Sequence, residues 1–161
     1  MTEPDGTPYF RILDVEECES LLARNSVGRI AFSRGNRIEI IPLHYTFARG
    51  VLCGRTARGT SLEETGDDFH GSRPVAFEVD EVEGLFRWRS VVVHGNLHAA
   101  ARGDLEWKRN TGDWEEALRS FRTLMPDAFT ENDRTRFRNI LIRIDAAEVS
   151  GREAVPERAT P

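Results

Sequence analysis

Residues 27–56 read VGRIAFSRGNRIEIIPLHYTFARGVLCGRT, and this stretch carries the strongest signal for the fold. Three segments in it are rich in β-branched and aromatic residues: 27–32, 38–47 and 51–56. Short turns that contain glycine separate the segments, and such turns join neighbouring antiparallel strands. The stretch therefore predicts a three-stranded antiparallel meander.

The flanking sequence predicts three more strands and three helices. The further strands are expected at 74–79, 88–101 and 137–149. The helices are expected at 14–25, where Asp14 and Glu17 form a capping box, and at 59–65 and 111–125. Strands that follow one another without regular helical crossovers argue against a parallel doubly wound sheet. Six antiparallel strands with helices over the openings predict a mainly β fold, a small barrel that closes its own edges.

Composition limits the class of protein. The chain has 161 residues, a formal net charge of −5 and two cysteines. One domain at 12–150 is expected, between flexible tails at 1–11 and 151–161. The acidic charge disfavours nucleic acid as a partner, because phosphate binding needs a basic face. The sequence has neither an apolar run of membrane-spanning length nor a signal peptide, so we expect a cytoplasmic protein with no membrane partner.

The segment from Arg55 to Ser61 unites arginine, threonine, serine and glycine where a strand passes into a short helix. Hydroxyl groups, guanidinium groups and free N–H groups at a helix start together favour an anion, and a phosphate monoester suits them. A solvated turn with ordinary capping residues explains the same residues equally well. The residues alone leave both interpretations open.

Pro42 stands in the middle of the strand expected at 38–47. Proline cannot donate a hydrogen bond to a strand ladder, so it marks an edge, a bulge or an interruption that faces a ligand. Backbone groups freed there can bind the edge of a planar heterocycle beside Leu43, His44 and Tyr45. An edge strand with a packed tyrosine and a hydrogen-bonded histidine is the alternative.

The strand expected at 88–101 begins with Trp88 and Ser90, an aromatic ring and a hydroxyl group that can flank a flat ring system. A tryptophan packed in the core is the simpler explanation. His94 and His98 share one face of this strand. Two histidines without a nearby cluster of cysteine or aspartate do not make a metal site, so no metal is expected.

Five blocks of sequence, in chain order, carry a resemblance to a known family: SVGRIAF at 26–32, IPLHY at 41–45, RTARGT at 55–60, PVAFEVD at 74–80 and WRSVVVHG at 88–95. Over about residues 12–150 the chain resembles the pyridoxamine 5′-phosphate oxidase-like family of FMN-binding split barrels. Within that family it is most similar to the branch with nitroimidazole-reductase-type resistance proteins. The resemblance implies a six-stranded antiparallel split barrel with flanking helices, and a homodimer with two FMN molecules at its interface.

The resemblance also implies roles for individual residues. Arg55 and Thr56 would bind the FMN phosphate, and the Pro42–Tyr45 segment would lie along the isoalloxazine ring. Three further residues would approach the flavin or the substrate, also from the partner chain: Trp88, Ser90 and Val91.

The phosphate site departs from the family at one position. The family commonly has a lysine where this chain has Ser61, which Leu62 follows. The loss of one cation from a dianion site removes a charge-assisted contact worth about 1.5–3 kcal/mol. Arg58, one turn earlier, is the cation that would replace it.

The implied function is that of an FMN-dependent oxidoreductase of a small planar substrate, such as a nitroaromatic or a pyridoxamine-phosphate-like compound. His44 is the candidate proton donor, because histidine side chains titrate near neutral pH. Two other classes stay open: a non-catalytic split barrel that holds flavin, haem or another flat ligand, and a deazaflavin-dependent reductase. Ser61 favours the non-catalytic protein, whereas the intact Arg55 and Thr56 favour the oxidoreductase.

Overall fold

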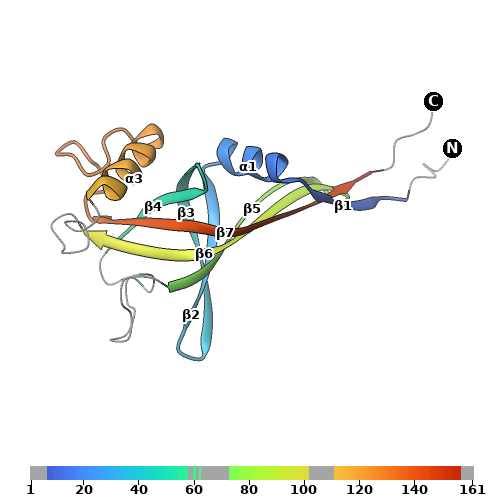
Figure 1. The fold of residues 1–161 in the computed structure, drawn as a ribbon, viewed down its shortest axis with the longest axis horizontal. Coiled ribbons are helices and arrows are strands. Elements are labelled where there is room, and N and C mark those ends of the chain that lie inside the picture. The colour runs from blue at the N-terminus through green and yellow to red at the C-terminus, as the bar shows by residue number, and fades with distance from the viewer. Residues whose placement is uncertain (1–6, 58–59, 61, 63–72, 102–110, 157–161) are drawn as a thin grey trace.

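The computed structural model describes residues 7–57, 60, 62, 73–101 and 111–156. These residues form seven β-strands and two α-helices (Figure 1). In chain order the elements are β1 Tyr9–Leu13, α1 Val15–Arg24, β2 Val27–Arg34, β3 Arg37–Ala48, β4 Val51–Thr56, β5 Arg73–Gly84, β6 Arg87–Ala101, α3 Thr111–Leu124 and β7 Ile140–Val155. Neither described helix is long and apolar enough to cross a membrane. Most of the short helix expected at 59–65 lies outside the described residues.

The strands form one antiparallel sheet in the order β1-β7-β4-β3-β2-β5-β6. β6 also pairs with β7, from Trp88↔Ala154 to Ala101↔Ile140, so six strands close into a ring. β1 lies outside this ring, against the C-terminal end of β7. The predicted mainly β, antiparallel split barrel with flanking helices is confirmed, and β1 is a seventh strand that the sequence did not predict.

The meander at 27–56 folds as predicted, because its turns accept left-handed backbone. Gly35, between β2 and β3, has φ of 59°, and Gly50, between β3 and β4, has φ of 76°. Glycine adopts positive φ at no steric cost, so it permits tight turns between neighbouring strands. Arg49 also has positive φ, at 52°, although it has a side chain.

Strand β5 is longer than predicted. It continues to Gly84, five residues beyond the predicted end at residue 79. The charged residues do not end the strand because each has a basic partner. Asp80 lies 2.9 Å from Arg29, and Glu81 lies 2.7 Å from Arg24. The hydrogen bond from Arg24 lowers the pKa of Glu81 to about 2.

The flexible tails predicted at 1–11 and 151–161 need correction. Residues 9–11 belong to β1 and residues 151–155 belong to β7, and the two segments pair with each other. The charges in these segments are typical of tails, but here they form ion pairs within the sheet. The outermost residues, 1–6 and 157–161, lie outside the described residues.

Gly151 explains why the last strand does not end where the sequence suggested. A Cβ at this position would lie 2.6 Å from Cys18 Sγ and 2.9 Å from a methyl group of Leu13, so glycine lets α1 lie close against β7. Two residues later, Glu153 accepts a hydrogen bond from Arg11 Nε at 2.5 Å. The close packing of α1 against Gly151 and the ion pair between Arg11 and Glu153 therefore allow β7 to continue past residue 149.

The two helices cover different parts of the ring. α1 begins at the predicted capping box, in which Glu17 N donates to Asp14 Oδ1 at 2.8 Å and Asp14 N donates to Glu17 Oε2 at 2.9 Å. Its buried Leu21 and Leu22 join the core inside the ring. α3 packs against β3, β4 and β7 and encloses a second core, in which Phe121 is fully buried.

One end of the sheet extends as an arm, which consists of residues 9–13, 82–88 and 151–155. Figure 1 shows this arm reaching away from the ring and α3. The arm matters for the site because the exposed side chains of β1, Phe10 and Ile12, continue the outer surface of the sheet.

Candidate functional site

Alternate side chains of the strands point away from the interior of the ring and form one continuous surface, the outer face. The strand pairing places one row of this surface across β3, β2, β5, β6 and β7: Pro42, Arg29, Glu78, Val92 and Ser150. A second row lies two residues away: Ile40, Ala31, Ala76, His94 and Glu148. On the arm, β1 continues the outer face with Phe10 and Ile12.

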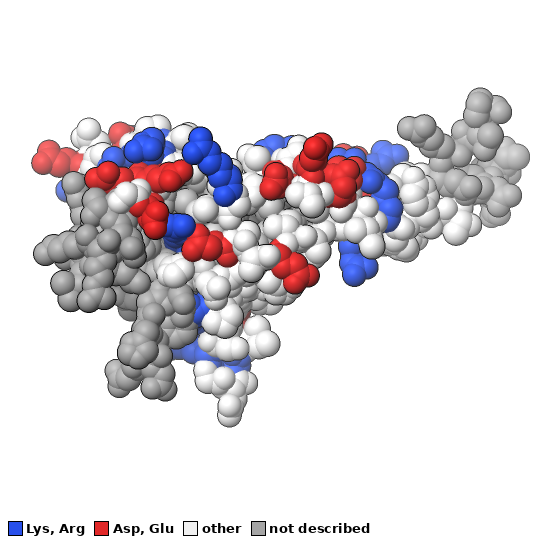
Figure 2. All heavy atoms as spheres, in the orientation of Figure 1, with Lys and Arg blue, Asp and Glu red and all other residues white. Residues whose placement is uncertain are grey.

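The outer face is unusually apolar for a surface this exposed. Six of its large apolar side chains are between 52% and 77% exposed: Phe10, Ile12, Val27, Ile38, Ile40 and Val82. Among its charged residues, Arg29 is paired, since its Nη1 lies 2.9 Å from both Glu78 and Asp80. By contrast, acidic and basic side chains gather over α1 and α3 (Figure 2). A large exposed apolar surface marks a site of interaction.

Four of the sequence-predicted site residues lie on the outer face: Pro42, His44, Trp88 and Ser90. Ser90 Oγ donates to Glu78 Oε1 at 3.0 Å. The Trp88 ring packs against Phe10, with ring centroids 6.0 Å apart. β4 pairs with β3 only between Tyr45 and Ala48, so Pro42 lies where β3 has lost this neighbour. Proline is tolerated at such an open edge.

Four other predicted residues are buried and point into the core: Leu43, Tyr45, Leu62 and Val91. For the three strand residues this follows from the alternation of side chains, since each is adjacent to a residue of the outer face. Tyr45 OH donates to the backbone oxygen of Leu22 at 2.6 Å, and burial raises the pKa of Tyr45. These side chains hold the ring together, and they are not presented to a ligand on the outer face.

Arg55 lies on β4 under the end of α3 and is only 5% exposed. Its guanidinium group meets Asp133, which is 6% exposed: Nη1 donates to Oδ2 at 2.5 Å and Nη2 donates to Oδ1 at 3.2 Å. Nη2 also donates to Thr135 Oγ1. The rings of Phe121 and Phe129 flank the group, with centroids 5.7 Å and 5.5 Å from Cζ.

The buried pair of Arg55 and Asp133 is balanced in charge. The hydrogen bonds from Arg55, together with those from the backbone N–H groups of Phe129 and Thr135, hold the pKa of Asp133 well below its usual range. Arg55 therefore has a carboxylate partner that the sequence analysis did not foresee. Its Nε atom is buried and has no hydrogen-bond partner within the described residues.

Thr56 ends β4 and begins the segment predicted to bind phosphate. Its Oγ1 lies 2.9 Å from Thr60 Oγ1, which donates to the backbone oxygen of Ala57 at 2.9 Å. The structure thus brings two predicted hydroxyl groups together. Arg58 and Ser61 lie outside the described residues.

Gly54 links this turn to the outer face. A Cβ at Gly54 would lie 2.8 Å from the carbonyl oxygen of His44, so the two backbones approach as closely as glycine permits. Thr56 follows two residues later on the same strand. His44 and Thr56 therefore lie on adjacent strands but on opposite sides of the sheet, His44 on the outer face and Thr56 toward the ring interior. Trp88 lies further away, on the arm.

Asp133 and Thr135 are the residues that the sequence analysis missed. Asp133 Oδ1 accepts from Thr135 N at 2.9 Å, which is the turn that an aspartate makes with the backbone two residues later. This local pattern could have identified the turn from the sequence. The pairing with Arg55, 78 residues earlier, had no local signal.

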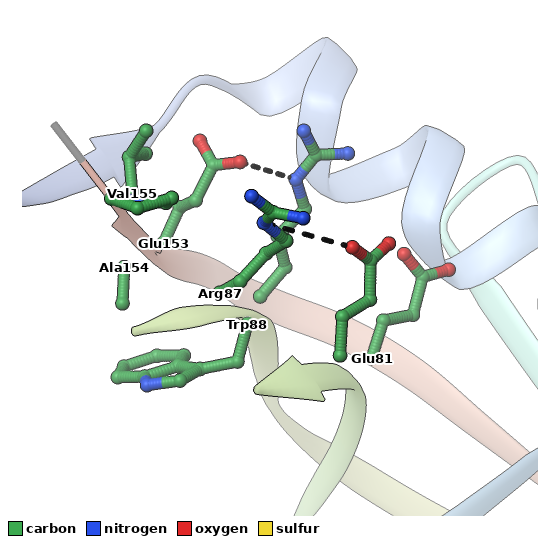
Figure 3. Close-up of a pocket in the computed structure, with 9 residues that line it drawn as sticks. Glu81, Arg87, Trp88, Glu153, Ala154 and Val155 are labelled. Atoms are coloured by element: carbon green, nitrogen blue, oxygen red, sulfur yellow. Dashed lines mark hydrogen bonds and ion pairs between the residues drawn. The ribbon is translucent and has the colours of Figure 1, made fainter. Parts of the chain in front are cut away.

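A cleft of about 420 Å³ lies on the side of the arm opposite to the outer face. Glu153 forms part of its wall and accepts hydrogen bonds from Arg89 at 2.6 Å and from Arg11 at 2.5 Å. Figure 3 shows the Trp88 ring pointing away from the charged groups around Glu153 and Arg87. The two sides of the arm therefore differ: the outer side carries Phe10, Ile12 and Trp88 beside the exposed Arg152, and the cleft side is mainly charged.

The fold and the outer face define the class of protein, a split barrel with an exposed, largely apolar sheet surface. A model of the pyridoxamine 5′-phosphate oxidase family matches residues 14–153. The chain belongs to the pyridoxamine 5′-phosphate oxidase family, as the resemblance predicted. Among curated proteins, none matches the chain.

Solved structures of similar fold agree with this assignment. A FAD-binding protein from Mesorhizobium loti is 26% identical with a TM-score of 0.67, over 91% of this chain and 98% of that one. A FAD-binding protein from Mycobacterium smegmatis is 23% identical with a TM-score of 0.62, over 92% and 100%. A proposed 5-nitroimidazole antibiotic resistance protein from Bacteroides thetaiotaomicron is 13% identical with a TM-score of 0.61, over 100% and 99%. The last two likenesses concern the fold alone.

Proposed function

We propose that this protein is a flavin-dependent oxidoreductase of a small planar substrate, with the flavin bound at the outer face. The observation that carries the proposal is the position of Pro42 and His44 on this uncovered, largely apolar surface. Family membership and the FAD named for the similar protein from Mesorhizobium loti support it. FMN is the proposed cofactor, and FAD and deazaflavin are alternatives for the test.

FMN has two parts that the residues present must fit, the flat ring and the phosphate. Val27, Ile40 and Val92 give the outer face an apolar surface against which a flat ring can lie, as in most cofactor sites. To bind a phosphate at the end of β4, the hydroxyl groups of Thr56 and Thr60 would have to turn their protons away from each other and from the backbone oxygen of Ala57. The fit does not depend on Arg55, whose charge is balanced by Asp133.

The chain's own residues would hold the ring and move a proton. When bound, the flavin supplies the hydride and electron chemistry. His44 has an exposed side chain on the outer face, and histidine is the residue whose charge changes near neutral pH, so it is the proton donor we propose. Ser90 gives its own proton to Glu78, so its lone pairs remain available to accept a hydrogen bond from a ring N–H.

A second copy of the chain is the partner that we propose covers the outer face. Phe10 and Ile12 line the outer side of the arm, whereas Arg89 and Glu153 line the other side. The charged side suits solvent, and the apolar side suits the centre of an interface. A two-fold contact would bury the same patch on both subunits and would enclose the flavin between them.

Titration of the purified protein with FMN, followed by quenching of flavin fluorescence, tests the proposal. We expect one FMN per chain, a dimer in sedimentation velocity, and nicotinamide-dependent reduction of a nitro compound. His44→Ala should keep FMN and lose turnover. The matched control is His98→Ala, because His98 Nε2 lies 3.3 Å from Asp145 Oδ2 and away from the proposed site. This variant should keep both FMN binding and turnover.

Three results would count against parts of the proposal. Failure to bind FMN, FAD or deazaflavin would overturn it as a whole. Binding of a flavin without any turnover would indicate a non-catalytic flavin-binding protein and not an oxidoreductase. Full turnover in His44→Ala would remove the proposed proton donor.

A further inference from the structure

We propose that Glu78 is a positioning residue of the outer face, which makes Ser90 a hydrogen-bond acceptor for the ring N–H group of a planar ligand. The inference rests on the proposed function, since the flavin is the ligand that it concerns. Glu78 acts through Ser90 and does not itself contact the ring. The evidence is a chain of hydrogen bonds that links β2, β5 and β6 across the outer face.

The first part of this chain holds the Glu78 side chain in place. Arg29 lies directly across from Glu78 in the pairing of β2 with β5. Its Nη1 donates to Glu78 Oε2 at 2.9 Å and to Asp80 Oδ1 at 2.9 Å, so one guanidinium nitrogen holds two carboxylates of β5. The bond from Arg29 occupies Oε2 of Glu78 and leaves Oε1 for Ser90.

The second part fixes the direction of the Ser90 hydroxyl group. Ser90 Oγ donates to Glu78 Oε1 at 3.0 Å, because an ionised carboxylate accepts hydrogen bonds and has no proton to give. A serine hydroxyl group has a single proton, so Ser90 can offer only its lone pairs to another group. Ser90 therefore presents an acceptor on the outer face.

The surroundings of Ser90 suit the edge of a flat ring. Val92 is two residues further along β6, so it lies on the same face, and it belongs to the apolar surface proposed for the ring. A ring that lies against Val92 can reach Ser90 with its edge. Oxidised isoalloxazine has one ring N–H group, at N3, and an acceptor beside that edge favours it. The site would therefore select planar heterocycles that carry an N–H group at the edge.

The experiment compares the dissociation constants of FMN and of 3-methyl-FMN, in which a methyl group replaces the proton on N3. We expect the wild type to prefer FMN about tenfold, the size of one hydrogen bond. Glu78→Gln has a single side-chain oxygen, and Arg29 donates to it, so the amide NH2 group faces Ser90 and donates to Oγ. The Ser90 proton then turns toward the ring. This variant should bind FMN about tenfold more weakly and 3-methyl-FMN as the wild type does.

The matched control is Asp80→Asn. It removes a carboxylate from the same Arg29 nitrogen and leaves the bond from Ser90 to Glu78 in place. This variant should keep the preference for FMN. Ser90→Ala removes the acceptor itself and should lose the preference, and it serves if Glu78→Gln does not fold.

Four results would overturn the inference. Equal losses for both compounds in Glu78→Gln would show a merely structural role. A lost preference in Asp80→Asn would mean that the charge of the cluster decides, and not the bond to Ser90. A preference that persists in Glu78→Gln or Ser90→Ala would exclude Ser90 as the acceptor. Wild-type protein that binds both compounds equally would refute the inference and leave the proposed function standing, whereas wild-type protein that binds no flavin would refute the proposed function itself.

Discussion

Replacing Asp133 with alanine would leave the Arg55 guanidinium group buried without its counter-charge. Both side chains of the pair are at most 5% exposed, so solvent cannot replace the lost carboxylate. Breaking a buried ion pair by removing one partner costs about 3–5 kcal/mol. For a chain of this size, each kcal/mol lowers the melting temperature by about 2–4 °C. We therefore expect Asp133→Ala to melt about 6–20 °C below the wild type.

Urea denaturation at several pH values is the assay. The pKa of Asp133 is lowered in the folded protein, so its contribution to stability is present above the pKa of the unfolded state and is lost as the pH falls toward the folded value. The free energy of unfolding should differ most between wild type and Asp133→Ala at neutral pH. This difference should become smaller below about pH 4. Other lowered carboxylates, such as Glu81, are common to both proteins and cancel in the difference.

Two controls decide whether the reasoning about burial is right. Glu116→Ala removes the partner of Arg49 in an exposed pair at 3.6 Å, and it should change the free energy of unfolding by less than about 1 kcal/mol. The double variant Arg55→Met/Asp133→Leu replaces both charges with apolar groups and should recover most of the loss. Asp133→Ala could lower the free energy of unfolding by less than about 1 kcal/mol, or by the same amount at pH 3 as at neutral pH. Either result would refute the claim that a buried ion pair is broken.

Three further predictions concern the sheet and its helix. Gly28→Ala places a Cβ 2.7 Å from a ring atom of the fully buried Phe77, so it should destabilise the fold by about 1–3 kcal/mol in urea denaturation; a loss within error of zero would contradict this. Ile40→Glu puts a charge in the middle of the outer face, and sedimentation should show a monomer in place of the proposed dimer; an unchanged dimer would exclude this face as the interface. Asp14→Ala removes the cap of α1 and should cost about 1 kcal/mol by thermal unfolding, whereas Asp14→Ser should cost much less.

The ring of strands could be predicted because its signals are local. Gly35 and Gly50 mark turns that only antiparallel neighbours can use, and Asp14 with Glu17 marks the start of α1 within four residues. The strands at the edge of the sheet gave no such signal. β1 is held by the pair of Arg11 and Glu153, which are 142 residues apart, so its sequence looks like a charged tail.

The candidate site could also be predicted only in part. Period-two alternation in β3 predicts that Leu43 and Tyr45 share one side while Pro42 and His44 share the other, but it does not say which side is buried. Tertiary packing decides this, because α1 closes the ring on the side of Tyr45 and accepts its hydroxyl group at Leu22. The outer face followed from the same packing.

The sequence by itself determined the antiparallel split barrel, its family and the segments that surround the candidate site, since these depend on turns, caps and residue order. Only the tertiary structure decided what Arg55 does. A guanidinium group at the end of a strand suits a phosphate as well as a carboxylate, and its partner depends on which residue the fold brings within about 3 Å. Here the segment after α3 delivers Asp133 to that position. Burial of the pair then makes it a fixed internal contact, while the Thr56 hydroxyl group, on the other side of β4, contacts Thr60.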